Sequence, residues 1–240
     1  MDDDFSERAA LPVEHGGDRK AQLVETLRRR ILSLELKPGA IVDEVELGAE
    51  FGLSRPPVRE LLRQMAAEGY LELAPNRATR VSALSYESIR SFFQCAPVIY
   101  SATTQLAAER ATPADVARLR AIQARFKEAI AAHDIDLRIH CNDQFHLEIG
   151  KIANNAHFMP SLQRVLLDHA RLGKIFHQPS PSAEKSFTSM AVHEHDLIID
   201  AIERQDASAA VEIIRTHMEL SRRRMSSYAM PDFLNIPLAS

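Results

Sequence analysis

The stretch LGAEFGLSRPPVRELLRQMAAEGYL, residues 47–71, decides the fold of the N-terminal part of this chain. Two short helices are expected in and around it, over about 44–51 and 55–68, joined by a tight turn. Gly52 can adopt the left-handed conformation that ends a helix. Ser54 can cap the next helix by accepting a hydrogen bond from an unpaired backbone N–H. The pattern therefore predicts a helix-turn-helix.

The second of these helices has an apolar face and an adjacent basic face. Pro56 and Pro57 lie in its first turn, where a missing N–H costs little. The apolar stripe, expected to dock on the preceding helix, consists of Val58, Leu61, Leu62 and Met65. The basic face carries Arg55, Arg59 and Arg63, four residues apart. Such a face suits the DNA major groove, where arginine pairs with guanine edges or clamps phosphates; an ordinary solvated basic face is the alternative.

The flanking segments complete a winged domain. A first amphipathic helix is expected from about 18 to 34, because leucine and isoleucine repeat there at helical spacing. Residues 70–73 and 79–82 are predicted as two short strands around a turn. The turn holds Asn76 and Arg77, which could reach the adjacent DNA backbone or minor groove. Three helices and a small β-hairpin are the winged helix-turn-helix arrangement.

The bulk composition predicts a mainly helical, soluble globular protein. Its 240 residues suffice for two domains with separate cores. Hydrophobic residues make up 45%, charged residues 26%, and there are only 8 glycines. The formal net charge is −4, so the chain is not a generally basic nucleic-acid binder. DNA binding would have to depend on a few well-placed arginines.

Four segments are predicted along the chain. Residues 1–17 are acidic and form a disordered arm, and residues 18–83 form the winged domain. Residues 84–229 form an all-α, antiparallel helical bundle, and residues 230–240 are a frayed tail. Bundle helices are expected over about 86–110, 113–132, 135–153, 158–176, 184–204 and 207–228.

Two further features predict a cytoplasmic protein that does not interact with membranes. No apolar run approaches the roughly 18 residues that a membrane span needs, and the acidic N-terminus argues against a targeting segment. Cys95 and Cys141 are predicted to be buried free thiols in a reducing cytosol.

Three histidines fall on apolar stripes of different predicted helices. His146 lies four residues after Asn142, so the two share a helix face, while His195 and His217 stand among isoleucines. A polar group on the inner stripe of a helix needs a partner. Three imidazoles from three helices could share a divalent metal; alternatively, each is a separately hydrogen-bonded core histidine.

Residues 40–81 resemble the winged helix-turn-helix of GntR-type regulators. The resemblance is carried by Ser-Arg, Pro-Val-Arg-Glu and Glu-Gly at this spacing. It implies that Arg55 and Arg59 contact operator bases or phosphates, assisted by Asn76 and Arg77 of the wing. Ser54 and Arg63 complete the predicted set of DNA-binding residues. Ala78 departs from the family pattern, because relatives that share the Pro-Asn-Arg turn usually have glycine there.

Residues from about 86 to 228 resemble the all-helical FCD effector domain of the FadR-type branch of these regulators. The matching pieces are Asn-Asp-Gln-Phe-His at 142–146, Glu-His-Asp-Leu-Ile at 194–198 and Thr-His-Met at 216–218. In many such domains an Asp and three His hold a metal at the centre of the bundle, and an organic-acid effector often completes its coordination.

The resemblance implies a divalent metal ion, with zinc expected first and nickel or manganese as alternatives. The implied ligands are His146, His195 and His217, with Asn142 at the position where the family has Asp. An amide oxygen can ligate a cation, but it is neutral and a weaker donor than a carboxylate.

A second departure concerns the effector. Relatives often place an Arg in the first effector-domain helix to meet an effector carboxylate, with a Glu one turn later. Ala96 and Tyr100 stand at these positions, and Pro97 is expected to interrupt the helix. Arg138, Arg164, Arg171 and Lys174 could supply a substitute charge, and Arg138 and Arg171 are the predicted effector-binding residues.

The leading hypothesis is a ligand-responsive transcription regulator, most simply a repressor. A homodimer would present two recognition helices to a palindromic, double-stranded operator, and a small-molecule effector would change their spacing or freedom. The rival class is a metal-dependent hydrolase using the three histidines, although the chain has no Gly-x-Ser-x-Gly or P-loop pattern. A helical protein-interaction module is the third alternative.

Overall fold

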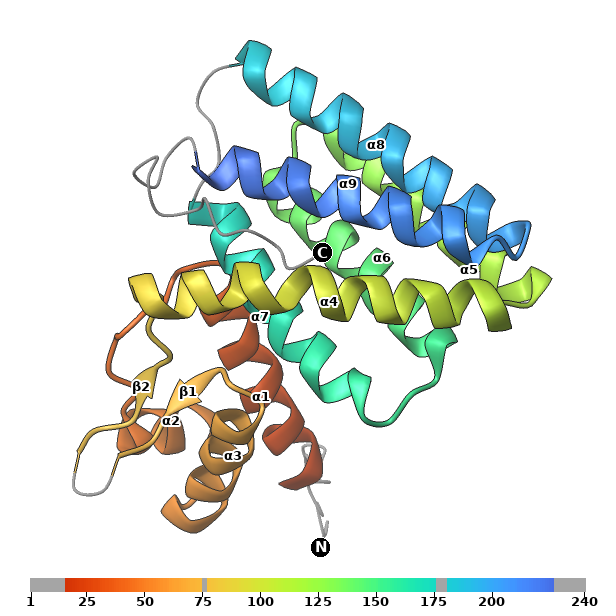
Figure 1. Ribbon diagram of the computed structural model, residues 1–240. Helices are drawn as coiled ribbons and strands as arrows, with labels where there is room; N and C mark the ends of the chain where they lie inside the picture. Colours follow the sequence, from red (N-terminus) through yellow and green to blue (C-terminus); the bar gives the residue numbers. More distant parts are fainter. Residues whose placement is uncertain (1–15, 75–76, 176–180, 227–240) are drawn as a thin grey trace, which may run out of the picture.

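The computed structural model describes residues 16–74, 77–175 and 181–226, and it has two parts of different architecture (Figure 1). In the N-terminal part, three helices precede a two-stranded antiparallel hairpin in which Leu71 pairs with Val81. These elements are α1 (Gly16–Leu32), α2 (Glu44–Phe51), α3 (Arg55–Ala67), β1 (Leu71–Glu72) and β2 (Arg80–Val81). The predicted three helices and small hairpin are confirmed.

The turn between α2 and α3 forms as predicted, but its cap does not. Gly52 has the left-handed conformation, with φ 60°, and its N–H donates to the carbonyl of Gly48. Ser54 occupies the N-cap position of α3, yet its side chain accepts no capping hydrogen bond. A cap of this kind uses the N–H of the second or third helical residue. These residues are Pro56 and Pro57, which have no N–H, so the predicted Ser54 cap is wrong.

The core of the winged domain is formed by the apolar stripes of α1 and α3 together with the hairpin. Val58, Leu62 and Met65 of α3 are buried, and Leu61 is partly buried, as the stripe predicted. The core also contains Leu23, Leu27, Ile31, Leu47, Leu71, Val81 and, from the helical domain, Leu167. Because α3 packs through this stripe, its arginine face points away from the core.

The C-terminal part contains the six long helices that were predicted. They are α4 (Tyr86–Arg110), α5 (Pro113–Ala131), α6 (Ile135–Ala153), α7 (Phe158–Ile175), α8 (Pro181–Glu203) and α9 (Ala207–Ser226). The first, α4, packs against α6, α7, α8 and α9, while α5 packs against α6 and α8. In Figure 1, α4 crosses the middle of the molecule, with α8 and α9 above it.

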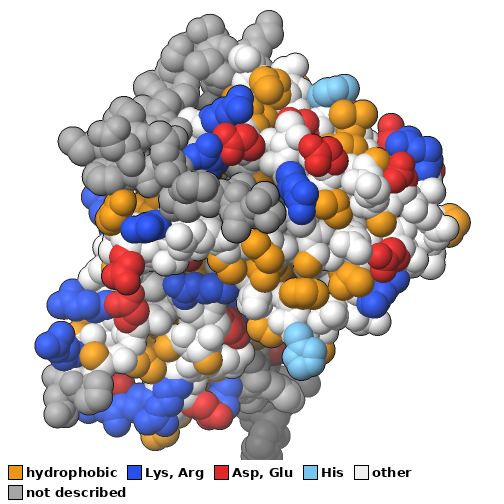
Figure 2. Space-filling view, viewed as in Figure 1, with side chains coloured by type: hydrophobic (Ala, Val, Ile, Leu, Met, Phe, Trp, Pro, Cys, Tyr) orange, Lys and Arg blue, Asp and Glu red, His pale blue; other side chains and the backbone are white. Residues whose placement is uncertain are grey.

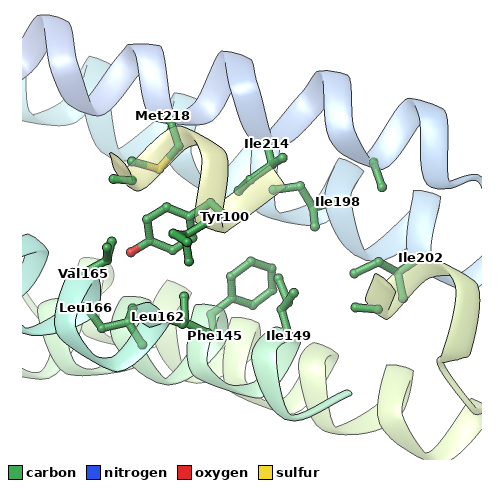
Figure 3. Packing of buried hydrophobic residues seen from close by; sticks show 14 of the residues in the cluster. Tyr100, Phe145, Ile149, Leu162, Val165, Leu166, Ile198, Ile202, Ile214 and Met218 are labelled. Atoms are coloured by element: carbon green, nitrogen blue, oxygen red, sulfur yellow. The ribbon is translucent and has the colours of Figure 1, made fainter. Parts of the chain in front are cut away.

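Helix α4 runs through Pro97 without a break, so the expected interruption is wrong. Proline removes one backbone hydrogen bond. The helix nevertheless holds because the residues around Pro97 are fixed by burial, among them Phe93, Ala96 and Tyr100. Figure 3 shows Tyr100 and Phe145 at the centre of the bundle, between the aliphatic side chains of α8 and α9 and those of α7.

Helix α7 attaches the winged domain to the bundle. Leu167 packs into the winged domain's core, and Arg164 donates a hydrogen bond to the carbonyl of Gly69. Arg171 is fully buried and donates to Ser82 twice, from Nη2 to the carbonyl oxygen (2.5 Å) and from Nη1 to Oγ (3.1 Å). Arg171, predicted to bind the effector, is therefore engaged at the joint between the domains.

The remaining expectations are met only in part. Cys141 is a buried free thiol as predicted, but Cys95 is exposed, because it lies on the outer face of α4. Helix α1 begins at Gly16, inside the predicted arm, while residues 1–15 and 227–240 lie outside the described part of the chain. None of the helices in the described part is both long and apolar enough to cross a lipid bilayer.

Candidate DNA-binding surface and metal centre

The arginines predicted to read DNA lie on one exposed face of the winged domain. Arg55, Arg59 and Arg63 on α3 are exposed, and so is Arg77 at the wing. Lys and Arg side chains gather at the lower left of Figure 2, over the region where α2, α3 and the wing lie. Asn76 lies outside the described residues.

A groove of about 810 Å³ runs between α3 and the wing. Arg59, Arg63 and Arg77 line it, together with Glu44 from the start of α2 and Ala78 from the wing. Ala78 is not among the residues with a positive φ, so the wing does not require a glycine there. A basic groove beside a short, exposed helix suits a DNA duplex.

Arg59 is held by an acidic residue that sequence reasoning did not single out. Its Nε donates to Glu44 Oε2 (2.8 Å) and its Nη2 donates to Glu44 Oε1 (2.7 Å). This hydrogen bond from Arg59 is the main reason that the pKa of Glu44 lies below its usual value. The pair is a bidentate link between α2 and α3.

Three of the predicted metal ligands meet in the centre of the bundle. His146 comes from α6, His195 from α8 and His217 from α9, and each is at most 1% exposed. One ring nitrogen from each lies within 4.8 Å of the others. Packing of the helices thus brings three residues that are far apart in the sequence together as a compact set of nitrogen donors.

The partner of His195 fixes which of its ring nitrogens carries the hydrogen. The Gln123 amide donates from Nε2 to the carbonyl of Val192 (2.9 Å) and to Asp196 Oδ1 (3.1 Å). Its Oε1 therefore faces His195 Nδ1, 3.1 Å away, and can only accept from it. The hydrogen is on Nδ1, which leaves the Nε2 lone pair for a ligand.

His217 is arranged in the same way. Its Nδ1 lies 2.9 Å from Glu194 Oε2, so it donates to a carboxylate and Nε2 keeps its lone pair. A carboxylate behind an imidazole is the usual outer partner of a metal-binding histidine.

His146 is the least satisfied of the three. Neither of its ring nitrogens has a hydrogen-bond partner among the described residues, and Nε2 of His195 and of His217 also has none. Most buried polar atoms are hydrogen-bonded. Three separately satisfied core histidines would not leave these atoms without partners, whereas a shared metal would give each of the three side chains a partner for one ring nitrogen.

Burial keeps two of these imidazoles neutral. The pKa values of His146 and His195 lie well below the ordinary histidine value, chiefly because burial disfavours the charged ring and secondarily because of the neighbouring histidines. Metal coordination requires the neutral imidazole. His146 and His195 are therefore in the form that binds a cation at neutral pH.

A small cavity of about 50 Å³ reaches one of the three histidines, His217. His217, Asn142 and Arg138 line it, together with Asp143 and His169. The Asn142 side chain hydrogen-bonds to the carboxylate of Asp143. Asn142 and Arg138 thus lie at the same cavity, whereas Arg171 is not among its lining residues.

Four other residues around the centre were not assigned a role from the sequence. Gln123 and Glu194 support the histidines, and the Tyr100 hydroxyl lies 3.0 Å from Nδ1 of His169. Glu194 directly precedes His195 in the Glu-His-Asp motif, so the sequence did contain a signal for it. Gln123 and His169 have no such signal, because each belongs to a helix distant in sequence from its partner.

Two known protein families match separate parts of the chain. Residues 19–81 match the family described as "Bacterial regulatory proteins, gntR family", and residues 97–220 match the FCD domain. The chain belongs to the GntR family. The FCD domain places this GntR regulator in the FadR subfamily.

Several characterised regulators are similar over most of their length. The Escherichia coli repressor RspR is 24% identical over 200 residues, which cover 82% of this chain and 85% of the relative. The galactonate operon transcriptional repressor of E. coli is also 24% identical, with 85% and 95% covered, and NanR of Cronobacter sakazakii is 28% identical, with 82% and 80% covered.

Solved structures show the same fold. E. coli McbR/YncC superposes with a TM-score of 0.74 at 19% identity and covers 88% of this chain and 98% of its own. A GntR regulator from Rhodococcus sp. RHA1 gives 0.70 at 20% identity, with 88% and 99% covered.

This GntR regulator is a DNA-binding transcription regulator. The relatives named above are transcription regulators and not enzymes, so they support this class over the metal-dependent hydrolase.

Proposed function

We propose that the chain is a repressor whose operator affinity is controlled by a small organic acid bound beside a divalent metal in the helical domain. One observation carries this proposal: three buried imidazoles with unpartnered ring nitrogens occur in the same chain as a winged helix-turn-helix. A buried nitrogen without a partner is costly, and a shared metal would offset that cost at one nitrogen of each imidazole.

The proposed metal ligands are His146, His195 and His217, with the Asn142 amide oxygen as a further donor. Zinc is the first candidate because nitrogen donors suit it, and nickel or manganese are alternatives. When bound, the metal would supply a positive charge that a carboxylate can ligate. Arg138, which is buried and lines the same cavity, would meet a second anionic group of the effector.

Helix α7 would couple effector binding to the position of the winged domain. His169, Ala170 and Gly173 line the cavity, while Leu167 and Arg171 of the same helix contact the winged domain. A ligand that favours one position of α7 would therefore favour one position of the winged domain.

On DNA, the proposed active form is a homodimer in the cytoplasm. Each protomer would insert α3 into a major groove of a palindromic, double-stranded operator, with half-sites about one helical turn apart. Arg55, Arg59 and Arg63 would contact bases or phosphates, and Asn76 and Arg77 of the wing would contact the adjacent backbone or minor groove.

Elemental analysis of the purified full-length protein tests the metal site. About one zinc, nickel or manganese ion per chain is expected in the wild type, and little in His195→Ala. The exposed His193, two residues away on the same helix, supplies the control His193→Ala, which should keep its metal. Full metal content in His195→Ala would refute the ligand assignment.

DNA binding is tested with a duplex selected by the wild-type protein from a randomised library. Arg55→Ala and Arg63→Ala should each weaken binding about tenfold or more, since each removes a base or phosphate contact. Arg125→Ala is the control, because Arg125 is exposed on α5 in the bundle. Equal affinity of all variants would exclude this face of α3, and a monomeric mass in the complex would exclude the dimer.

A further inference from the structure

Arg59 and Glu44 form the best-defined charged pair on the DNA-facing side of the winged domain. Both oxygens of Glu44 accept from Arg59, at 2.7 and 2.8 Å, and both residues line the groove between α3 and the wing. Of the three arginines on the basic face of α3, only Arg59 is ion-paired with another described residue. An acidic side chain placed among DNA-binding arginines repels phosphates, so its presence calls for an explanation.

The geometry of the pair leaves one edge of the guanidinium available. Arginine has five N–H donors in a planar fork. Glu44 occupies the edge formed by Nε and Nη2. The outer edge, formed by Nη1 and the second hydrogen of Nη2, has no partner among the described residues. This outer edge has the two parallel donors that pair with O6 and N7 of guanine.

Glu44 is itself firmly placed. It is the first residue of α2, where Oδ1 of the N-cap residue Asp43 accepts from the N–H of Val45 (2.7 Å) and of Glu46 (3.3 Å). Carboxylates are stabilised at a helix N-terminus. The capped turn therefore holds the Glu44 backbone, and the bidentate pair holds the guanidinium relative to it.

We propose that Glu44 is a positioning residue: it orients the Arg59 guanidinium so that it hydrogen-bonds to guanine instead of contacting phosphates irrespective of sequence. The proposal rests on the place of Arg59 in the DNA interface proposed above. The ion pair restricts the rotamers of a long side chain, directs its outer edge into the groove, and makes a phosphate contact unfavourable because Glu44 would be brought close to the same anion. Glu44 thus contributes to sequence specificity more than to affinity.

The test compares Glu44→Ala with Glu46→Ala in the full-length protein. Both changes remove a carboxylate from the first turn of α2, but Glu46 is exposed and makes no hydrogen bond or ion pair with Arg59, so it is the matched control. Affinity is measured for the duplex selected by the wild type and for a scrambled duplex of equal length, over a range of salt concentrations.

Glu44→Ala should lower the ratio of specific to non-specific affinity about tenfold to hundredfold, the discrimination supplied by one bidentate base contact. Affinity for the scrambled duplex should stay equal or rise, and its logarithmic salt dependence should steepen by about one per protomer because Arg59 gains a phosphate. A repeated selection with the variant should lose guanine at one position per half-site. Glu46→Ala should retain the wild-type ratio and guanine preference.

Two further variants separate the possible failures. In an Arg59→Ala background, Glu44→Ala should have no additional effect on the ratio, because Glu44 acts through Arg59. An additional effect there, or a ratio in Glu44→Ala within twofold of Glu46→Ala, would overturn the proposal. If Arg59→Ala alone leaves the guanine preference intact, the result refutes the proposed role of Arg59 in the DNA interface, on which the role of Glu44 rests. A loss of affinity for both duplexes together with a lower melting temperature would mean that Glu44 is structural, which also overturns it.

Discussion

At the scale of single residues, the candidate metal centre depends on hydrogen bonds made by the far side of two of its imidazoles. Gln123 and Glu194 accept from Nδ1 of His195 and His217 and so direct Nε2 toward the cluster. His146 has no such partner among the described residues. The orientation of two ligands is thus set before any metal binds, and that of the third is set by packing.

Glu194→Gln should weaken zinc binding about tenfold to hundredfold, the usual cost of losing the outer partner of a metal-bound histidine. The amide keeps the shape of the side chain but removes the charge that strengthens the imidazole as a donor. Competition with a chromophoric chelator measures the affinity. Glu212→Gln, at an exposed position of α9, should leave it unchanged. Equal zinc affinity in all three proteins would contradict a supporting role for Glu194.

At the scale of elements, α7 belongs to both domains. It packs against α4 and α6 in the bundle and against α1 in the winged domain. Figure 1 shows it between the bundle above and the winged domain below. Arg171 is the most completely buried charged residue of this joint, with Ser82 and Asp168 as partners. The two domains should therefore unfold together.

Arg171→Met should uncouple the domains. The change leaves the Ser82 carbonyl without its partner and the Asp168 carboxylate paired with Arg164 alone. Removing one member of a buried pair costs about 3–5 kcal/mol. We expect one calorimetric unfolding transition in the wild type and two in the variant. Lys174→Met on the same helix breaks only a pair with Asp136 inside the bundle and should keep a single transition. A single transition in Arg171→Met would show that the joint is held by other contacts.

At the scale of the whole molecule, the metal would join helices that are distant in sequence. Its ligands come from α6, α8 and α9, which all meet the long helix α4 or its neighbours. A ligand that binds only the folded state stabilises it in proportion to the logarithm of its concentration. The metal should accordingly stabilise the folded bundle, in addition to its proposed role in binding the effector.

Chelation should lower the melting temperature by about 5–10 °C. A metal at a hundred times its dissociation constant contributes about 2.7 kcal/mol, and each kcal/mol is about 2–4 °C for a protein of this size. Differential scanning fluorimetry with and without a chelator measures the shift. His195→Ala should melt at one temperature in both conditions. A wild-type protein that is insensitive to chelation and to added zinc would contradict the stabilising metal.

The sequence by itself determined the helices, the hairpin and the identity of the key side chains, because these depend on local properties. Apolar residues at helical spacing, Gly52 at the turn and the four-residue spacing of Arg55, Arg59 and Arg63 all act over a few neighbouring residues. The three histidines were likewise recognisable as polar residues on apolar stripes. One local prediction was nevertheless wrong: Ser54 does not cap α3, because the two prolines that follow Arg55 lack the N–H groups that a cap needs.

Only the tertiary structure decided which side chains meet. Gln123 lies 72 residues from His195, Ser82 lies 89 residues from Arg171, and Glu44 lies 15 residues from Arg59. The sequence alone does not show whether an arginine faces an effector, a carbonyl or a carboxylate. Its partner is determined when helix packing brings distant segments within hydrogen-bonding distance and excludes water. The spacing of residues along the chain does not predict that arrangement.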